Sequence, residues 1–131
     1  MIDPLVSAAL AAANNAHAPY SEFHVGAAVL TEAGAVFPGC NVENASFGLT
    51  ICAERAAVCA AVTAGQPRIK AVVVVAPGAP APCGACRQVL AEFGPAMEVI
   101  LVDSLDTSRV RRTTLDVLLP EQFRLSERDD D

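Results

Sequence analysis

Three cysteines in this chain have the residue type and spacing of a metal site. Cys83 and Cys86 stand in the stretch PCGAC at the start of a predicted helix, where a separation of three residues brings both sulfurs to one side of the first turn. A CxxC pair alone fits a metal site, a redox pair or core packing. Cys52, at the start of the preceding predicted helix, supplies a third thiol and favours a metal. Three protein ligands leave the fourth position of a tetrahedral zinc open, which is typical of a catalytic site.

Glu54 and Arg55 follow in the stretch CAER, within the same helical turn as Cys52. The carboxylate of Glu54 can take a proton from a zinc-bound water and deliver it to a leaving group. Arg55 can donate to the sulfurs and offset the charge of three thiolates. Each residue also has an ordinary interpretation, as a charge at a helix N-terminus or a surface ion pair. Their clustering beside Cys52 favours the chemical interpretation.

The elements that position these residues alternate between helix and strand. Asp3 and Pro4 are typical of a helix start, EAGA of a hairpin turn, and the run IKAVVVVA of a strand covered on both faces. The predicted order is helix, strand, strand, helix, strand, helix, strand: residues 3–15, 24–31, 35–42, 52–64, 69–76, 84–94 and 97–103. A short helix over TTLDVLLP, capped by Thr113 or Thr114, follows.

This order predicts the α/β class: a three-layer α/β/α sandwich with a mixed central sheet. We expect one catalytic domain over residues 1–125 and an acidic, disordered tail, SERDDD, over residues 126–131. A crossover unit of helix and strand separates Cys52 from the CxxC pair. Such a unit carries successive helix starts to the same end of a sheet, so the three thiols are expected to converge there.

Composition argues against several classes of protein. The 131 residues suffice for one core and contain no apolar run long enough to span a membrane. The N-terminus lacks the basic start of a secretory signal, so a cytoplasmic location is expected. The net charge is −6, from 15 acidic and 9 basic residues, with no basic stripe. Nucleic acid is therefore an unfavourable partner, and a small neutral ligand fits better.

The remaining cysteines and histidines have structural interpretations. Disulfides are disfavoured in a reducing cytosol, so the five cysteines are metal ligands or packing residues. Cys40 and Cys59 do not share the ligand spacing and are assigned to packing. His17 and His24 are interpreted as solvent or core histidines rather than ligands.

Several longer stretches resemble the zinc-dependent cytidine deaminase family, of the small homotetrameric type. These are YSEFHVGAAVL, GCNVENASFG, ICAERAA, PCGACRQVLAEFG and LLPEQF, in family order, in addition to the CAE and PCGAC zinc signature. The resemblance implies hydrolytic deamination of cytidine and 2'-deoxycytidine to the uridines and ammonia, in pyrimidine salvage. It implies one Zn²⁺ per subunit on Cys52, Cys83 and Cys86, a zinc-activated water as nucleophile, and Glu54 as the proton shuttle.

The resemblance also implies the contacts with a nucleoside substrate. Phe23 would lie against the pyrimidine ring, Asn41 and Glu43 would hold the ribose hydroxyls, and the backbone around Ala53 and Cys83 would contact the base. In a homotetramer with shared active sites, two further residues would reach a neighbour's site: Phe47 and Phe123. A tyrosine is frequent in the family at the position of Phe47, so any contribution of that hydroxyl is absent here.

Three alternatives remain open on the sequence. A deaminase acting on RNA, DNA or a nucleotide would more often carry His in place of Cys52 and would need phosphate contacts, which the acidic charge disfavours. A relative that deaminates a nucleoside antibiotic such as blasticidin is a closer variant. A module that uses zinc only to fold would need a fourth ligand, and we find no convincing one.

Overall fold

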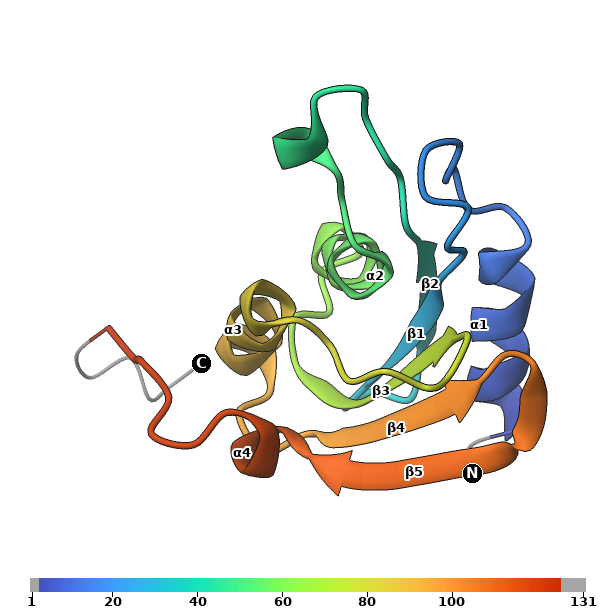
Figure 1. Cartoon of the computed structure of the whole chain (residues 1–131). Coiled ribbons are helices and arrows are strands. Elements are labelled where there is room, and N and C mark those ends of the chain that lie inside the picture. The colour runs from blue at the N-terminus through green and yellow to red at the C-terminus, as the bar shows by residue number, and fades with distance from the viewer. Residues whose placement is uncertain (1–2, 126–131) are drawn as a thin grey trace.

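The computed structural model describes residues 3–125 (Figure 1); the predicted acidic tail, 126–131, lies outside the described residues. The elements are α1 Asp3–Ala13, β1 Gly26–Thr31, β2 Val36–Cys40, η1 Phe47–Leu49, α2 Ala53–Thr63, β3 Ile69–Ala76, α3 Gly84–Phe93, β4 Glu98–Asp103, β5 Asp106–Thr114 and α4 Leu115–Leu118. Every helix and strand expected between residues 3 and 103 is therefore present. The short helix α4 follows Thr114, one of its two expected caps, although the Thr114 side chain makes no capping hydrogen bond.

The five strands form one mixed sheet in the order β2-β1-β3-β4-β5. β1 is antiparallel to both β2 and β3, whereas β3 and β4 are parallel. β2, β3 and β4 consequently run in one direction, and α2 and α3 are the crossovers between them. In Figure 1, α1 covers one face of the sheet and α2 and α3 cover the other. The predicted three-layer α/β/α sandwich with a mixed sheet is confirmed.

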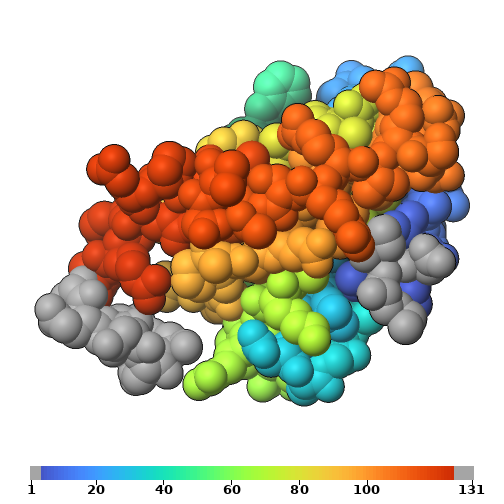
Figure 2. All heavy atoms as spheres, turned by 90° about the horizontal axis from the view of Figure 1, so that it is seen from below, coloured from blue at the N-terminus to red at the C-terminus, as the bar shows by residue number. Residues whose placement is uncertain are grey.

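β5 is the strand that the sequence pattern did not predict. It pairs antiparallel with β4 at the edge of the sheet, and most of its residues are exposed. Figure 2 shows β5 and the segment after it spread over one face of the molecule. Charged, exposed residues are common on edge strands because they discourage pairing with another chain. Such a strand has no alternation of apolar and polar residues, so its periodicity could not reveal it.

Two apolar cores flank the sheet, one on each face. On the α1 side, Leu5 packs with Val73 of β3. On the other side, Val58 of α2 and Leu90 of α3 pack with Val72 of β3. Neighbouring residues of β3 thus face opposite cores, which explains the unbroken apolar run of this strand. Within the described range, no helix has the length and apolar character that crossing a membrane would require.

α2 lies directly on β2 at Gly39. A Cβ atom at this position would lie 2.5 Å from the nitrogen of Ala57 and 2.7 Å from the carbonyl oxygen of Ala53. Only a residue without a side chain permits this approach of two backbones. The close contact brings the start of α2 beside the end of β2, where the residues of the site described next are found.

Candidate metal centre and active site

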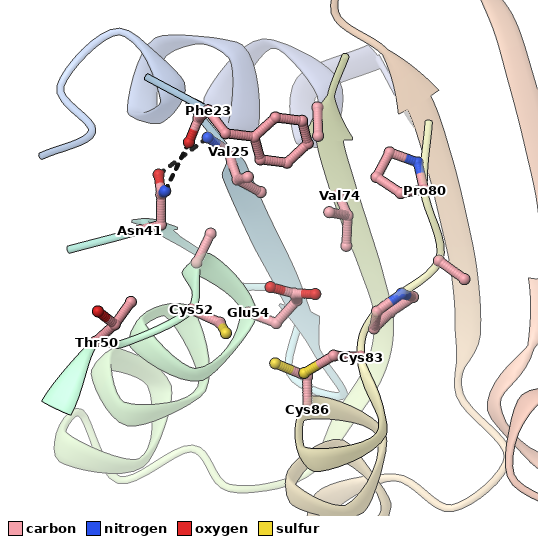
Figure 3. A pocket seen from close by; sticks show the side chains of 14 residues that line it. Phe23, Val25, Asn41, Thr50, Cys52, Glu54, Val74, Pro80, Cys83 and Cys86 are labelled. Atoms are coloured by element: carbon pink, nitrogen blue, oxygen red, sulfur yellow. Dashed lines mark hydrogen bonds between the residues drawn. The ribbon is translucent and has the colours of Figure 1, made fainter. Parts of the chain in front are cut away.

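The sulfurs of Cys52, Cys83 and Cys86 come together beyond the carboxyl ends of β2 and β3, all within 4.8 Å of one another (Figure 3). Cys52 is the N-cap of α2, Cys83 is the N-cap of α3, and Cys86 lies in the first turn of α3. Because the strands joined by these two helices are parallel, both helices begin at the same end of the strands. The three thiols therefore converge as expected from the crossover unit.

The electrostatic environment of the cluster favours the thiolate of Cys52. Neither α2 nor α3 has a side-chain hydrogen bond at its N-cap, so the positive ends of both helices act on the cysteines. A hydrogen bond from the Cys86 thiol lowers the pKa of Cys52, and the Arg55 guanidinium lowers it further. The same hydrogen bond, together with burial, raises the pKa of Cys86. The Cys86 thiol therefore donates to the Cys52 thiolate.

The donor set fits a single zinc ion. Thiolates are ligands that zinc prefers, and one divalent cation offsets most of the charge of three of them. Among residues 3–125, no fourth histidine, cysteine or carboxylate joins the cluster. The arrangement therefore has the three protein ligands and the open position of a catalytic site.

Glu54 lies in the first turn of α2, and its carboxylate points into the space beside the sulfurs (Figure 3). The residue is only 5% exposed. Burial is the main cause that raises the pKa of its carboxyl, and the charge of Cys52 adds to the effect. A buried carboxylate next to an open metal position is suited to accept and return a proton.

Arg55 contacts the cluster from the side of α2. Its Nη2 donates to Cys52 Sγ and to the carbonyl of Thr50, both at 3.5 Å. Its Nε is buried without a hydrogen-bond partner within the described part of the chain. The position agrees with the expected role of a donor that offsets thiolate charge.

A cavity of about 220 Å³ opens above the three sulfurs and Glu54. Its walls are mostly apolar, with Phe23 and Val74 on the sheet side and Pro80 and Pro82 from the loop before Cys83. An apolar cavity with one carboxylate and a metal site at its floor suits a flat, uncharged ring. This loop, PGAPAP, ends directly before Cys83 and was not among the expected site residues. Its direct connection to Cys83 was the signal that it forms a wall of the site.

Phe23, Asn41 and Ala53, expected to contact substrate, all line this cavity. Asn41 is buried, and its side chain has a second role that was not expected. Its Oδ1 accepts from the Val25 N–H at 3.0 Å, and its Nδ2 donates to the Phe23 carbonyl at 2.8 Å. Asn41 thereby holds the segment that presents the Phe23 ring (Figure 3).

Glu43, Phe47 and Phe123 do not line the cavity of their own chain. The Glu43 carboxylate accepts from the backbone N–H groups of Tyr20 and Ser21, at 3.0 and 3.2 Å, and from the Ser21 hydroxyl. The Ser21 hydroxyl is the first cause that lowers the pKa of Glu43. Phe47 is 73% exposed and Phe123 70% exposed. Their expected roles in substrate binding thus remain predictions.

The fold and the site together define the class of a zinc-dependent enzyme, with three cysteines that could hold the metal and a buried carboxylate beside them. The family model described as "Cytidine and deoxycytidylate deaminase zinc-binding region" matches residues 2–102. The chain belongs to this family.

Individual relatives extend over nearly the whole chain. A cytidine deaminase from Mycobacterium tuberculosis is 47% identical over 118 residues, which are 88% of this chain and 84% of the relative. One from Sporosarcina psychrophila is 42% identical over 124 residues, 93% of this chain and 90% of the relative. The crystal structure of cytidine deaminase from Burkholderia pseudomallei is similar with a TM-score of 0.88 and 49% identity, covering 94% of this chain and 99% of that one.

Proposed function

We propose that this protein hydrolyses cytidine to uridine and ammonia, with one Zn²⁺ held by Cys52, Cys83 and Cys86. The observation that carries the proposal is the position of the Glu54 carboxylate, buried in an apolar cavity directly beside the three sulfurs. Membership of the deaminase family and the names of relatives at 42–47% identity support this substrate. Activity on 2'-deoxycytidine and a role in pyrimidine salvage are part of the proposal.

Glu54 carries the protons in this mechanism. When bound, Zn²⁺ lowers the pKa of a coordinated water to about 7 and so supplies a nucleophile at neutral pH. The Glu54 carboxylate takes the proton that this water releases and delivers it to ring N3 as a C–O bond forms at C4. It then takes the proton of the new hydroxyl group on C4 and delivers it to the amino group, and the C–N bond breaks to release ammonia as the C4 carbonyl forms. One water is consumed, and Glu54 returns to its starting state.

The cavity walls would orient the nucleoside. The Phe23 ring offers a flat face for the pyrimidine, and the backbone of Ala53 and Cys83 would contact the base. Asn41 keeps one N–H and one lone pair after its two internal hydrogen bonds, which suffice for a ribose hydroxyl. Glu43 accepts three hydrogen bonds and also retains a free lone pair for the ribose.

We further propose that the protein is a homotetramer with shared active sites. Large apolar side chains are exposed at residue 20, over residues 47–51 and on the last described segment: Tyr20, Phe47, Leu49, Ile51, Phe123 and Leu125. In Figure 1, the segment around η1 projects beyond the rest of the fold. Exposed apolar surface of this kind marks a protein interface. Phe47 and Phe123 would then reach the cavity of a neighbouring copy, and light scattering would give the number of chains.

Metal analysis combined with a cytidine absorbance assay tests the enzymatic proposal. We expect one zinc per chain, turnover of cytidine that chelation abolishes, and little turnover of CMP or an oligonucleotide. Zinc without deamination would favour a module that uses the metal only to fold. A cytoplasmic location completes the proposal, because the five cysteines, three of them assigned to zinc, suit a reducing compartment.

A further inference from the structure

Arg87 lies outside the metal cluster but contacts the wall of the cavity. Its Nε donates to the carbonyl of Pro82 at 2.7 Å, and its Nη1 donates to the carbonyl of Leu118 at 2.8 Å. Pro82 directly precedes Cys83, and Leu118 is the last residue of α4. One guanidinium group therefore joins α3, the loop that forms the cavity wall, and the end of α4.

The loop before Cys83 has few other polar anchors. Pro80 and Pro82 have no N–H to donate, and residues 80–82 make no backbone–backbone hydrogen bond within the described chain. The nearest anchors before these residues are the N–H of Ala79, which donates to the carbonyl of Ala76 at 3.1 Å, and the N–H of Gly78, which donates to Asp103 Oδ1 at 3.0 Å. Arg87 thus supplies the hydrogen bond that holds the end of this loop.

The contact with Pro82 also determines the direction of the next backbone N–H. The described peptide bonds are all trans, so the carbonyl of Pro82 and the N–H of Cys83 point in opposite directions. The Cys83 N–H therefore points away from Arg87, and no acceptor for it is found among residues 3–125. Pro82 and Cys83 both line the cavity. Rotation of this peptide would change the cavity wall and the position of the Cys83 sulfur together.

Among residues 3–125, the charge of Arg87 is not used in an ion pair. The described ion pairs involve Arg109 and Arg112, whereas the Arg87 guanidinium is occupied by two backbone carbonyls. Charge-assisted hydrogen bonds of this length are among the stronger ones in proteins. The planar group can reach both carbonyls at once, and the bond to Leu118 keeps it in place to hold Pro82.

We propose that Arg87 is a positioning residue for the deamination proposed above, on which this inference rests. It orients the Pro82–Cys83 peptide, so that the Cys83 thiolate and the cavity wall have the geometry that the reaction needs. It touches neither the metal nor the substrate. A lysine cannot replace it, because an ammonium group is a point donor that does not span the two carbonyls.

The test compares Arg87→Ala and Arg87→Lys with the wild type, in the zinc-loaded protein with cytidine as substrate. We expect Arg87→Ala to retain one zinc per chain, to lose about 10- to 100-fold in kcat, and to change KM less than about threefold. Guanidinium ion at millimolar concentration should restore part of the lost kcat of Arg87→Ala, and Arg87→Lys should remain well below the wild type. Arg112→Ala is the matched control, because Arg112 pairs with Glu98 on the exposed edge strand, outside this cavity.

Three outcomes would overturn the inference. The first is an Arg87→Ala variant with the kcat of the wild type. The second is a loss of activity that parallels a loss of zinc and that guanidinium does not restore, which indicates a purely structural contribution. The third is a wild type that binds zinc without deaminating cytidine, which would remove the proposed function and this inference together. Wild-type turnover therefore separates a failure of the inference from a failure of the function.

Discussion

Asn41 holds the backbone carbonyl of Phe23 at 2.8 Å, so one buried amide positions the aromatic wall of the cavity (Figure 3). The same side chain accepts from the Val25 N–H through its Oδ1. Asn41→Asp keeps this acceptor but presents an oxygen to the Phe23 carbonyl. We expect the free energy of unfolding to fall by about 1–3 kcal/mol and KM for cytidine to rise, because a partly buried carbonyl loses its donor.

Chemical denaturation and steady-state kinetics would check this prediction. Asn44→Asp is the matched control, because Asn44 is exposed and its Oδ1 only accepts from the Ser46 N–H, which an aspartate can also do. An Asn41→Asp variant as stable and as active as Asn44→Asp would show that the Phe23 contact is dispensable.

Glu54→Gln should separate metal binding from proton transfer. The glutamine amide has nearly the same size but cannot carry a proton, so we expect kcat to fall by about 100- to 10,000-fold. Zinc content and thermal stability should stay close to those of the wild type, since Glu54 is not a member of the sulfur cluster. Normal turnover of cytidine by this variant would rule out Glu54 as the proton carrier.

Zinc removal should expose three thiols at once. Cys52, Cys83 and Cys86 are expected to react with a thiol reagent after chelation and to be protected when zinc is restored. Cys59, which was assigned to packing on the sequence, is exposed in the structure. It should therefore react in both states and serves as an internal reference. Activity should follow the protected thiols as zinc is titrated back. Protection of the three thiols that does not depend on zinc would contradict the assigned ligand set.

The Asp103 carboxylate should contribute to stability at neutral pH and lose this contribution in acid. Its Oδ1 accepts from the N–H groups of Gly78 and Leu105 at 3.0 and 2.9 Å, and these bonds hold its pKa below the usual carboxyl value. A carboxyl group with a lowered folded-state pKa stabilises the fold above its unfolded-state pKa, and the contribution is lost as the pH falls through the folded-state pKa.

Asp103→Asn should therefore have a lower free energy of unfolding than the wild type at pH 7, and this difference should shrink toward low pH. Urea unfolding over a pH series measures this, with Asp116→Asn as a control for the loss of one exposed carboxylate. A constant difference between Asp103→Asn and the wild type at every pH would show that the charge of Asp103 does not matter.

Gly39→Ala should disturb the contact between β2 and α2. The added Cβ would lie 2.5 Å from the nitrogen of Ala57, so the helix must shift, and we expect a loss of about 1–3 kcal/mol in the free energy of unfolding. Gly84→Ala is the control, because no atom lies within 4 Å of a Cβ placed there. Equal stability of the two variants, measured by thermal unfolding, would argue against close packing at Gly39.

The amino-acid sequence by itself determined the local elements and the chemistry-bearing residues. Apolar runs and helix caps predicted the elements from α1 to β4, because burial gives apolar residues a regular spacing in the sequence. The spacing of Cys52, Cys83 and Cys86 indicated a metal site, because successive helices of this fold begin at the same end of the sheet. The tertiary structure alone decided which distant polar groups meet. Four features depend on how the layers pack. They are the exposed strand β5, the hydrogen bond from Asn41 to the Phe23 carbonyl, the hydrogen bonds of Glu43 to the backbone at residues 20 and 21, and the bond from Arg87 to Leu118. A single hydrogen bond between residues far apart in the chain produces no regular pattern in the sequence, so only the packed fold reveals it.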